Sequence, residues 1–263
     1  MSTTSLTIVG SGIKFISHLT TEAKAYILQS EKVLYLVNDP VMKEWIQRNN
    51  PNAESLDKLY TQYPMRLHCY QAITNYILNT LQKNLHVCVV LYGHPAVFAK
   101  PALDAVIKAK AAGYDTRMLP GISAEDCLFA DLLINPGSSG CQSYEATDFL
   151  IHCRKIDPSS HLILWQVGII GVLGHPKSHD NTKGAALLLN YLNQYYHPRH
   201  EAVLYEAAQY PGFEPHIDRL PLIQLPTAKF SRLSTLYLPP AHKAPCDEAM
   251  LKALNIPIAD LQS

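Results

Sequence analysis

The sequence predicts a two-lobed α/β fold. The N-terminal lobe is expected to hold a mainly parallel sheet with flanking helices, and the C-terminal lobe a mixed sheet. Strand-like and helix-like patterns alternate through the first half of the 263 residues, which is typical of a parallel sheet covered by helices. In the second half, two strand-like runs come close together near the C-terminus, which indicates an antiparallel portion. We place the lobes at 1–120 and 121–240, followed by a tail or helix at 241–263.

In the N-terminal lobe, four segments have the composition of strands and four have helical periodicity. The third strand-like segment, "HVCVVLYG", is apolar on both faces, so we expect it in the middle of the sheet. Thr21 is the expected N-cap of the first helix, Pro40 begins the second and Gly113 closes the last. The expected strands cover 6–12, 32–39, 86–93 and 114–121, and the expected helices cover 20–32, 40–49, 66–83 and 100–113.

The C-terminal lobe has a different pattern, dominated by strands. The boundary falls near Pro120 and Gly121, where a strand-like segment ends. The last residues, "DEAMLKALNIPIADLQS", have the pattern of a C-terminal helix or arm. The expected strands of this lobe cover 161–170, 202–210, 217–225 and 234–240.

Composition excludes several classes of protein. Lys+Arg and Asp+Glu each number 22, so no excess of positive charge is available to bind a nucleic-acid backbone. None of the six cysteines forms a C-x-x-C pair, which favours reduced thiols of a cytosolic protein over disulfides or a zinc site. The N-terminus lacks the features of a signal peptide, and the longest apolar stretch is too short to span a bilayer. We therefore predict a soluble cytoplasmic protein with no nucleic-acid or membrane partner.

Two short motifs give only weak signals. "VGSGIKF" has two glycines after a strand but not the third of a dinucleotide-binding turn, and Asp39 is only a loose match to the acidic residue such a site needs. A tight strand-to-helix turn is the alternative interpretation. In "HPKSHD", His175 and His179 are spaced like metal ligands on a helix, but the proline and nearby glycines indicate a polar loop. No metal site is predicted.

A richer pattern lies in "LYTQYPMRLHCYQAITNY". Tyr60, Tyr63, Arg66 and Tyr70 recur at spacings of three, three and four, and in a helix they would share one face. One interpretation is a tyrosine-rich surface whose rings pack while their hydroxyls reach water. The other is a set of hydrogen-bond donors, one permanently cationic, that converge on an oxygen gaining negative charge.

Several segments together resemble a known family. "LTIVGSGI", "YGHPAVF", "MLPGISAEDCLFADL" and "STLYLPP" occur in the order found in the tetrapyrrole-methylase superfamily, whose members bind S-adenosyl-L-methionine between two α/β lobes. "YGHPAVFAKP", "PGISAEDCLFADLLINPGSSGCQSYEATDFL" and "LILWQVG" resemble more particularly the borosin α-N-methyltransferases, which methylate backbone amides of a ribosomally made peptide. The resemblance extends from about Leu6 to Pro240.

This resemblance implies a tetrapyrrole-methylase-like fold with the cofactor in the cleft, and it assigns roles to particular residues. S-adenosyl-L-methionine is the implied cofactor, and no metal is implied. The implied catalytic cluster is Tyr60, Arg66, Tyr70 and Tyr92, with Tyr63 as a further candidate. The implied cofactor-binding residues are Tyr92, His94, Val97, Phe98, Ser123, Ala124, Gln166, Ala207, Ser234 and Thr235.

The residues suggest a mechanism for amide methylation. An amide nitrogen is a poor nucleophile because its lone pair is delocalised into the carbonyl. Arg66 and Tyr70 can donate to the carbonyl oxygen as it becomes an imidate, and Tyr63 or Tyr60 is the candidate base. Tyr92 would aim the methyl group, and His94 is expected to position the cofactor rather than to carry a proton.

The substrate is expected to be a separate precursor peptide, supplied in trans. The sequence reaches Ser263 soon after the last lobe, with no Val/Ile-rich tail that could serve as a core peptide. The resemblance also implies a homodimer that forms a 2:2 complex with the precursor. Three alternatives stay open: a methyltransferase of a small tetrapyrrole-like substrate, a non-catalytic protein that binds the cofactor or a peptide, and a nicotinamide-dependent oxidoreductase.

Overall fold

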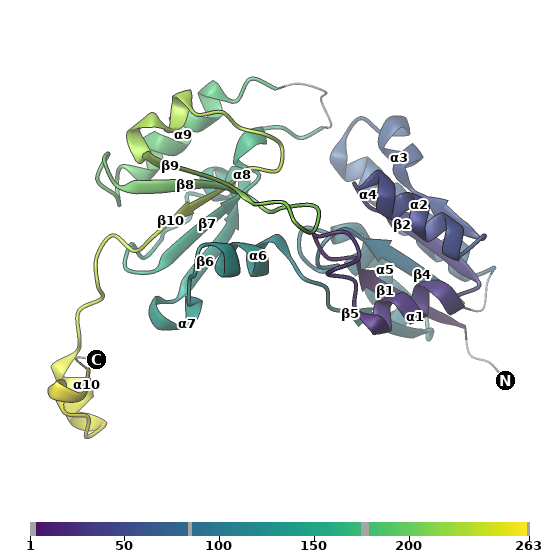
Figure 1. The fold of residues 1–263 in the computed structure, drawn as a ribbon, viewed down its shortest axis with the longest axis horizontal. Helices are drawn as coiled ribbons and strands as arrows, with labels where there is room; N and C mark the ends of the chain where they lie inside the picture. Colours follow the sequence, from purple (N-terminus) through teal and green to yellow (C-terminus); the bar gives the residue numbers. More distant parts are fainter. Residues whose placement is uncertain (1–3, 84–85, 175–178, 262–263) are drawn as a thin grey trace. The chain divides into compact units, whose positions relative to one another are not determined.

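The computed structural model describes residues 4–83, 86–174 and 179–261, which divide into two compact units (Figure 1). Unit 1 comprises Met1–Ile134, Gly171–Asp180 and Tyr205–Ile217, and unit 2 comprises Asn135–Ile170, Asn181–Leu204 and Asp218–Ser263. The chain therefore passes between the units several times. The boundary expected near Pro120 lies ahead of Ile134, where the chain first leaves unit 1.

Unit 1 is built on a five-stranded sheet in the order β3-β2-β4-β1-β5. The four strand pairs are all parallel. Strand β4 lies at the centre and is buried from Val87 to Leu91, as its apolar pattern predicts. The strands are β1 Ser5–Gly10, β2 Lys32–Leu36, β3 Ala53–Ser55, β4 His86–Leu91 and β5 Asp115–Leu119.

Helices cover both faces of this sheet. Alternate residues of the strands point to opposite faces: Ile8 and Val89 pack with α4 and α5, whereas Val9 and Val90 pack with α1 and α2. The helices of the unit are α1 Thr21–Gln29, α2 Pro40–Asn49, α3 Asp57–Gln62, α4 Arg66–Leu81, α5 Lys100–Ala111 and α6 Ala124–Asp131.

The carboxyl edge of the sheet is closely packed by glycine. A Cβ on Gly10 would lie 2.3 Å from the carbonyl oxygen of Gly93, and one on Gly121 would lie 2.6 Å from the same oxygen. Gly12 and Gly93 exchange two backbone hydrogen bonds, of 3.3 and 3.0 Å. The loops that follow β1, β4 and β5 are thereby fixed against one another. Helix α4 leads into β4, so its first turn lies at this same edge.

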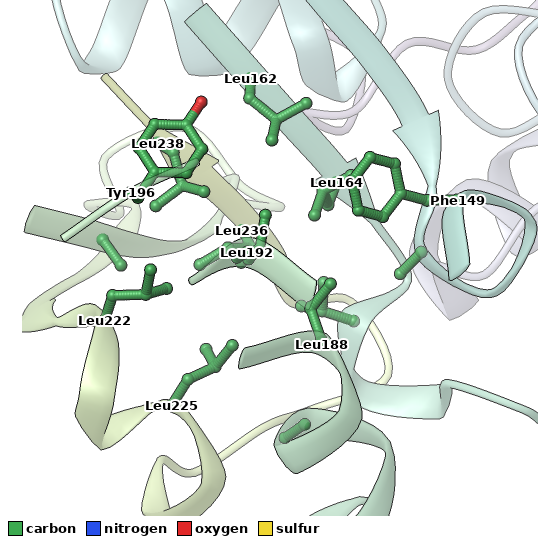
Figure 2. Close-up of a cluster of buried hydrophobic side chains, with 14 of the residues drawn as sticks. Phe149, Leu162, Leu164, Leu188, Leu192, Tyr196, Leu222, Leu225, Leu236 and Leu238 are labelled. Carbon is green, nitrogen blue, oxygen red and sulfur yellow. The ribbon is translucent and has the colours of Figure 1, made fainter. Parts of the chain in front are cut away.

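Unit 2 holds the second sheet, in the order β6-β7-β10-β8-β9. It is mixed, because β6 and β7 are parallel while β10 and β7 are antiparallel. Figure 2 shows the core of this unit, where leucines of the strands, of α9 and of the 3-10 helix η2 pack together with Phe149 and Tyr196. The elements are α7 Pro136–Ser139, β6 Cys141–Glu145, α8 Ala146–Ile151, β7 His161–Trp165, η1 Val167–Ile169, α9 Thr182–Leu192, β8 Glu201–Glu206, β9 His216–Pro221, η2 Leu222–Thr227, β10 Thr235–Leu238, α10 Glu248–Ala253 and η3 Ile258–Leu261.

The predicted fold class is confirmed, and the structure corrects some local details. The N-cap of α1 is Thr20 and not Thr21, because Thr20 has extended backbone and its side chain accepts from the N–H of Ala23. The strand expected over 217–225 ends at Pro221, where the chain turns into a 3-10 helix. Strand β6 was not predicted, since its half-buried sequence "CQSYE" lacks a run of apolar residues. Within the described residues, no helix is long and apolar enough to cross a membrane.

A charged cluster links helices α3 and α4 to strands β2 and β3 of the sheet. Glu54 of β3 accepts hydrogen bonds from Lys58 of α3 and Tyr76 of α4, and Lys32 of β2 lies 2.9 Å away. Burial alone would raise the pKa of Glu54, but the bonds from Lys58, Tyr76 and Lys32 lower it to about 2.

This cluster predicts a loss of stability in acid. Because the pKa of Glu54 in the folded protein lies below its ordinary value of 4.5, its contribution is fully present above pH 4.5 and is lost as the pH falls toward 2. Allowing for screening by solvent, we expect Glu54→Gln to remove about 1–2 kcal/mol of unfolding free energy at pH 7 and much less at pH 2.5. Urea unfolding at both pH values measures this. Glu44→Gln, which breaks an exposed pair with Arg48, is the control; equal losses in the two variants would contradict the assignment.

Candidate active site

Arg66 is held at the start of α4 by the segment that follows Ile170. Its backbone N–H donates to the carbonyl of Leu173 at 3.1 Å, and its Nη2 donates to the carbonyl of Val172, also at 3.1 Å. The neighbouring Met65 forms an isolated antiparallel bridge with Gly174. These contacts join segments about 106 positions apart in sequence and fix the guanidinium at the carboxyl edge of the sheet.

Two half-buried tyrosines, Tyr60 and Tyr70, share the electrostatic environment of Arg66. Burial raises the pKa of Tyr60 on α3, to which Tyr70 also contributes, and the Arg66 guanidinium opposes this rise. Burial likewise raises the pKa of Tyr70, again with Arg66 acting in the opposite sense. Burial is the dominant cause for both groups, so both phenols carry their proton at neutral pH. The three side chains therefore form a set of donors around one permanent positive charge.

Tyr63 does not belong to this arrangement. The four residues were expected on one helical face, but the helix is interrupted: α3 ends at Gln62 and α4 begins at Arg66. Tyr63 has extended backbone, with φ −120° and ψ 99°, and its side chain is 38% exposed. Pro64 explains the interruption, because a proline disfavours helical backbone in the residue before it. The structure thus brings together Tyr60, Arg66 and Tyr70 and leaves Tyr63 at the surface.

Tyr92 stands directly after the central strand β4. Its backbone N–H donates to the carbonyl of Leu36 at 3.0 Å, which continues the pairing of β4 with β2. Its hydroxyl donates to Oε1 of Gln209 at 3.0 Å. Burial raises the pKa of Tyr92, and the hydrogen bond to Gln209 opposes part of that rise. Tyr92 is therefore a neutral phenol with a fixed partner.

The loop after Tyr92 presents one histidine nitrogen and two apolar side chains. Nδ1 of His94 accepts from the N–H of Ala96 at 3.1 Å, so in neutral His94 the hydrogen sits on Nε2, which is a donor. Val97 and Phe98 are 39% and 48% exposed. Phe98 has φ 52°, a conformation that is rare for residues other than glycine and that often marks a functional site.

Three further predicted cofactor residues lie in unit 1. The Ser123 hydroxyl forms a capping box with Asp126 and so serves α6 itself, while Ala124 is the first residue of that helix. The carbonyl of Ala207, just after β8, accepts from Nε2 of Gln209 at 3.3 Å. Ala124 and Ala207 can therefore contact a ligand only through backbone groups and a methyl side chain.

Unit 2 brings the other three predicted residues together. Leu236 of β10 pairs with Leu164 of β7, so continuing this register places Ser234 and Thr235 beside the end of β7, where Gln166 lies. Gln166 has left-handed backbone, with φ 59° and ψ 31°, a second strained position among the candidates. The side chain of Ser234 accepts from the N–H of Ser231 at 2.8 Å.

The glycine turn after β1 does not have the form of a dinucleotide site. The helix begins only at Thr21, well after the glycines, and a Cβ on Gly12 would lie 2.1 Å from Cβ of His18. Nδ1 of His18 accepts from the N–H groups of Ile13 and Lys14 and closes the loop. The glycines therefore serve backbone packing, as the tight-turn interpretation expected. Of the weak metal motif, His175 lies outside the described residues.

Comparison with known protein families decides the classification. The profile of the Tetrapyrrole (Corrin/Porphyrin) Methylases matches residues 5–218. The chain is a member of the tetrapyrrole methylase family. A uroporphyrin-III-C-methyltransferase from Thermus thermophilus has a similar fold, with a TM-score of 0.65 at 18% identity, covering 95% of this chain and 100% of that one. At that identity the likeness concerns the fold alone.

Two fungal relatives of this tetrapyrrole methylase are much more similar in sequence. A methyltransferase/ribosomally synthesized cyclic peptide gymnopeptides precursor of Gymnopus fusipes is 41% identical over 260 residues, which cover 97% of this chain and 62% of the relative. A methyltransferase/ribosomally synthesized type I borosin cyclic peptide precursor of Coprinopsis marcescibilis is 39% identical over 260 residues, covering 95% and 66%. The chain thus spans less than two thirds of the length of these relatives.

Sequence reasoning missed several residues that contact the candidate site residues of this tetrapyrrole methylase or lie beside them. Gln209 holds the Tyr92 hydroxyl, and Tyr210 donates to Oδ1 of Asp39 at 2.7 Å. Val172 and Leu173 hold Arg66 through backbone carbonyls only. A backbone acceptor leaves no signature in the sequence, so Val172 and Leu173 could not have been found. Gln209 could have drawn attention only as the polar residue that follows "LYEAA".

Proposed function

We propose that this tetrapyrrole methylase is an S-adenosylmethionine-dependent methyltransferase that methylates backbone amide nitrogens of a peptide. The observation that carries the proposal is the cluster of Arg66, Tyr60 and Tyr70, a permanent cation and two half-buried phenols gathered at the carboxyl edge of a parallel sheet. Ligands of open α/β sheets bind at that edge. The names of the fungal relatives, which couple a methyltransferase with a peptide precursor, support a peptide as substrate.

The candidate cofactor residues fit S-adenosylmethionine in chemical type. They offer backbone groups, small side chains and apolar surface, which suit an adenosine and an amino-acid chain. Phe98 and Gln166 hold strained backbone conformations, which are found where a ligand is bound. The cofactor supplies a methyl group activated by a sulfonium. The proposed cofactor residues are those that the family resemblance implies: Tyr92, His94, Val97, Phe98, Ser123, Ala124, Gln166, Ala207, Ser234 and Thr235.

Arg66 and the tyrosines address the main difficulty of the reaction, the low nucleophilicity of an amide nitrogen. As electron density moves onto the carbonyl oxygen, donors from Arg66 and Tyr70 stabilise the imidate form. One preorganised donor of this kind lowers the barrier by about 2.7–4 kcal/mol. With S-adenosylmethionine bound, the amide nitrogen would take the methyl group from the sulfonium sulfur, and a base on the protein would take the N–H proton.

Tyr60 and Tyr63 stay the two candidates for that base. Burial beside Arg66 makes Tyr60 the better placed of the two with respect to the proposed oxyanion donors, whereas Tyr63 is exposed at the end of α3. Because burial raises the pKa of Tyr60, little of its phenolate is present at neutral pH. The N–H proton of the substrate amide must therefore leave as the imidate forms.

The substrate peptide is proposed to be a separate precursor, and the protein to act as a homodimer in a 2:2 complex with it. The names of the two fungal relatives describe a methyltransferase and a peptide precursor in one protein. A peptide bound in trans would meet the same donors as one bound in cis, so the chemistry above does not depend on this choice. Sedimentation of the protein with and without a precursor tests the stoichiometry.

Co-expression with candidate precursor peptides, followed by fragmentation mass spectrometry, tests the function. We expect mass increases of one methyl group, located by fragmentation on backbone nitrogens. Methyl groups on side chains, or methylation of a tetrapyrrole precursor but of no peptide, would contradict the proposal. Cofactor binding without any methylated product would favour a non-catalytic binding protein. A melting shift with NAD but none with S-adenosylmethionine would favour the oxidoreductase instead.

A further inference from the structure

Gln209 and Tyr210, two consecutive residues far from β4 in sequence, both bond to side chains at the carboxyl edge of the sheet of unit 1. Gln209 accepts from the hydroxyl of Tyr92 at 3.0 Å, and the hydroxyl of Tyr210 donates to Oδ1 of Asp39 at 2.7 Å. Tyr92 and Asp39 line the same small cavity, of about 10 Å³. That volume is close to the least that can hold one water molecule, so little space remains on this side of Tyr92.

The orientation of the Gln209 amide follows from its second bond. Its Nε2 lies 3.3 Å from the carbonyl oxygen of Ala207, and a carbonyl can only accept. The amide nitrogen must therefore face Ala207, which leaves the amide oxygen facing Tyr92. An amide oxygen carries no hydrogen, so the hydrogen in the bond between Tyr92 and Gln209 comes from Tyr92.

Gln209 itself is held in place from more than one direction. Its backbone carbonyl accepts from the N–H of Phe15 at 3.0 Å, in the loop that His18 closes. Tyr210, the next residue, is tied to Asp39, whose Oδ1 also accepts from the N–H of Val41 at the start of α2. The amide oxygen thus has a defined position with respect to β4, as a group that orients a reacting residue must have.

We infer that Gln209 is a positioning residue for methyl transfer: its amide oxygen holds the hydroxyl hydrogen of Tyr92, so the Tyr92 oxygen acts only as an acceptor toward the reacting groups. This inference rests on the proposed function and adds to it a role for Tyr92. A phenol oxygen has one hydrogen and two lone pairs. Because the hydroxyl hydrogen of Tyr92 points at Gln209, the lone pairs of the Tyr92 oxygen can face the positively polarised methyl group. They can keep that group in line with the amide nitrogen of the substrate peptide.

The same bond excludes Tyr92 as the base. A neutral amide oxygen does not take up the phenol proton at neutral pH, so Tyr92 keeps its hydrogen in the bond to Gln209. Proton removal is then left to another group, and the two tasks of aiming the methyl group and accepting the amide proton fall on different tyrosines.

The hydrogen bond is tested first without any substrate. In protein labelled at tyrosine Cζ with ¹³C, the Tyr92 resonance is assigned by its loss in Tyr92→Phe. We expect Gln209→Met to shift this resonance and to speed exchange of the hydroxyl hydrogen, because the acceptor is gone while the side-chain volume is kept. Tyr26→Phe, which removes an exposed hydroxyl bonded to Arg117, should leave the Tyr92 resonance in place. An unchanged Tyr92 resonance in Gln209→Met overturns the inference.

Its role in the reaction is tested by single-turnover methylation of a peptide that the unsubstituted protein methylates. We expect Gln209→Met to slow transfer about 10- to 100-fold, while the Kd for S-adenosylmethionine changes by less than about threefold. Gln209→Glu, which keeps an acceptor oxygen, should stay within about fivefold of the unsubstituted protein. Tyr92→Phe combined with Gln209→Met should be no slower than Tyr92→Phe alone, because both remove one interaction.

The outcomes separate this inference from the proposed function. Additive losses in the double variant, or full activity of Gln209→Met beside an active unsubstituted protein, overturn the role of Gln209 and leave the methyltransferase intact. If the unsubstituted protein methylates no peptide, the proposed function fails, and the positioning role fails with it even where the Tyr92 resonance reports the hydrogen bond.

Discussion

Arg66→Ala is expected to abolish detectable peptide methylation, with a fall in the single-turnover rate of at least about 1,000-fold. The guanidinium is the only permanent positive charge in the proposed donor cluster, and it acts on both Tyr60 and Tyr70. Its loss removes a donor from the imidate oxygen and leaves the two half-buried phenols without the charge that opposes the rise in their pKa. The Kd for S-adenosylmethionine should change by less than about threefold, since Arg66 is not among the proposed cofactor residues.

Two further substitutions make the result specific. Arg66→Lys keeps the charge but not the planar fork that donates to Val172, so we expect it to recover no more than about a tenth of the activity. Arg48→Ala removes an exposed arginine of α2 and should leave the rate unchanged. Circular dichroism and thermal melting check that Arg66→Ala is folded, since losing one hydrogen bond costs about 1 kcal/mol. Methyl counts like those of the unsubstituted protein would refute the role of Arg66.

The sheet of unit 1 could be predicted well because its signals are local and periodic. Strand β4 is apolar on both faces, which only a central strand requires, and α4 shows helical spacing over its whole length. Tyr63 shows where such reasoning fails. Its spacing from Tyr60 and Arg66 fits a helix, but Pro64 imposes extended backbone on it. The dipeptide "YP" carried that information, and the regular spacing of the tyrosines obscured it.

The supporting contacts of the site could not be predicted, because they join distant segments through single atoms. Tyr92 and Gln209 lie 117 positions apart, and Arg66 and Val172 lie 106 apart. No periodicity relates such pairs, and the acceptor for Arg66 is a backbone carbonyl that any residue provides. The reactive side chains could therefore be proposed from residue type and order, whereas the groups that orient them emerge only from the fold.

Tyr70→Phe is expected to slow methylation by about 100-fold or more without unfolding the protein. The substitution removes one hydroxyl and keeps the ring, so the packing of α4 on α3 is preserved. Because burial keeps Tyr70 protonated, the hydroxyl acts as a donor to the imidate oxygen, and its loss affects the transition state more than binding. Tyr76→Phe is the matched control: it lies on the same helix, its hydroxyl bonds to Glu54, and its transfer rate should be unchanged.

The pH profile then separates the donor from the base. If Tyr60 removes the amide proton, the rate should rise about tenfold per pH unit from pH 7 to 9. Burial raises the pKa of Tyr60 above 10, and at pH values below the pKa the phenolate fraction grows about tenfold with each pH unit. A donor contributes no such slope, so Tyr70→Phe should lower the whole profile and keep its slope, whereas Tyr60→Phe should flatten it. A flattened profile in Tyr70→Phe would instead assign the base to Tyr70 and the donor to Tyr60. A slope that survives in Tyr60→Phe and disappears in Tyr63→Phe would assign the base to the exposed tyrosine at the end of α3.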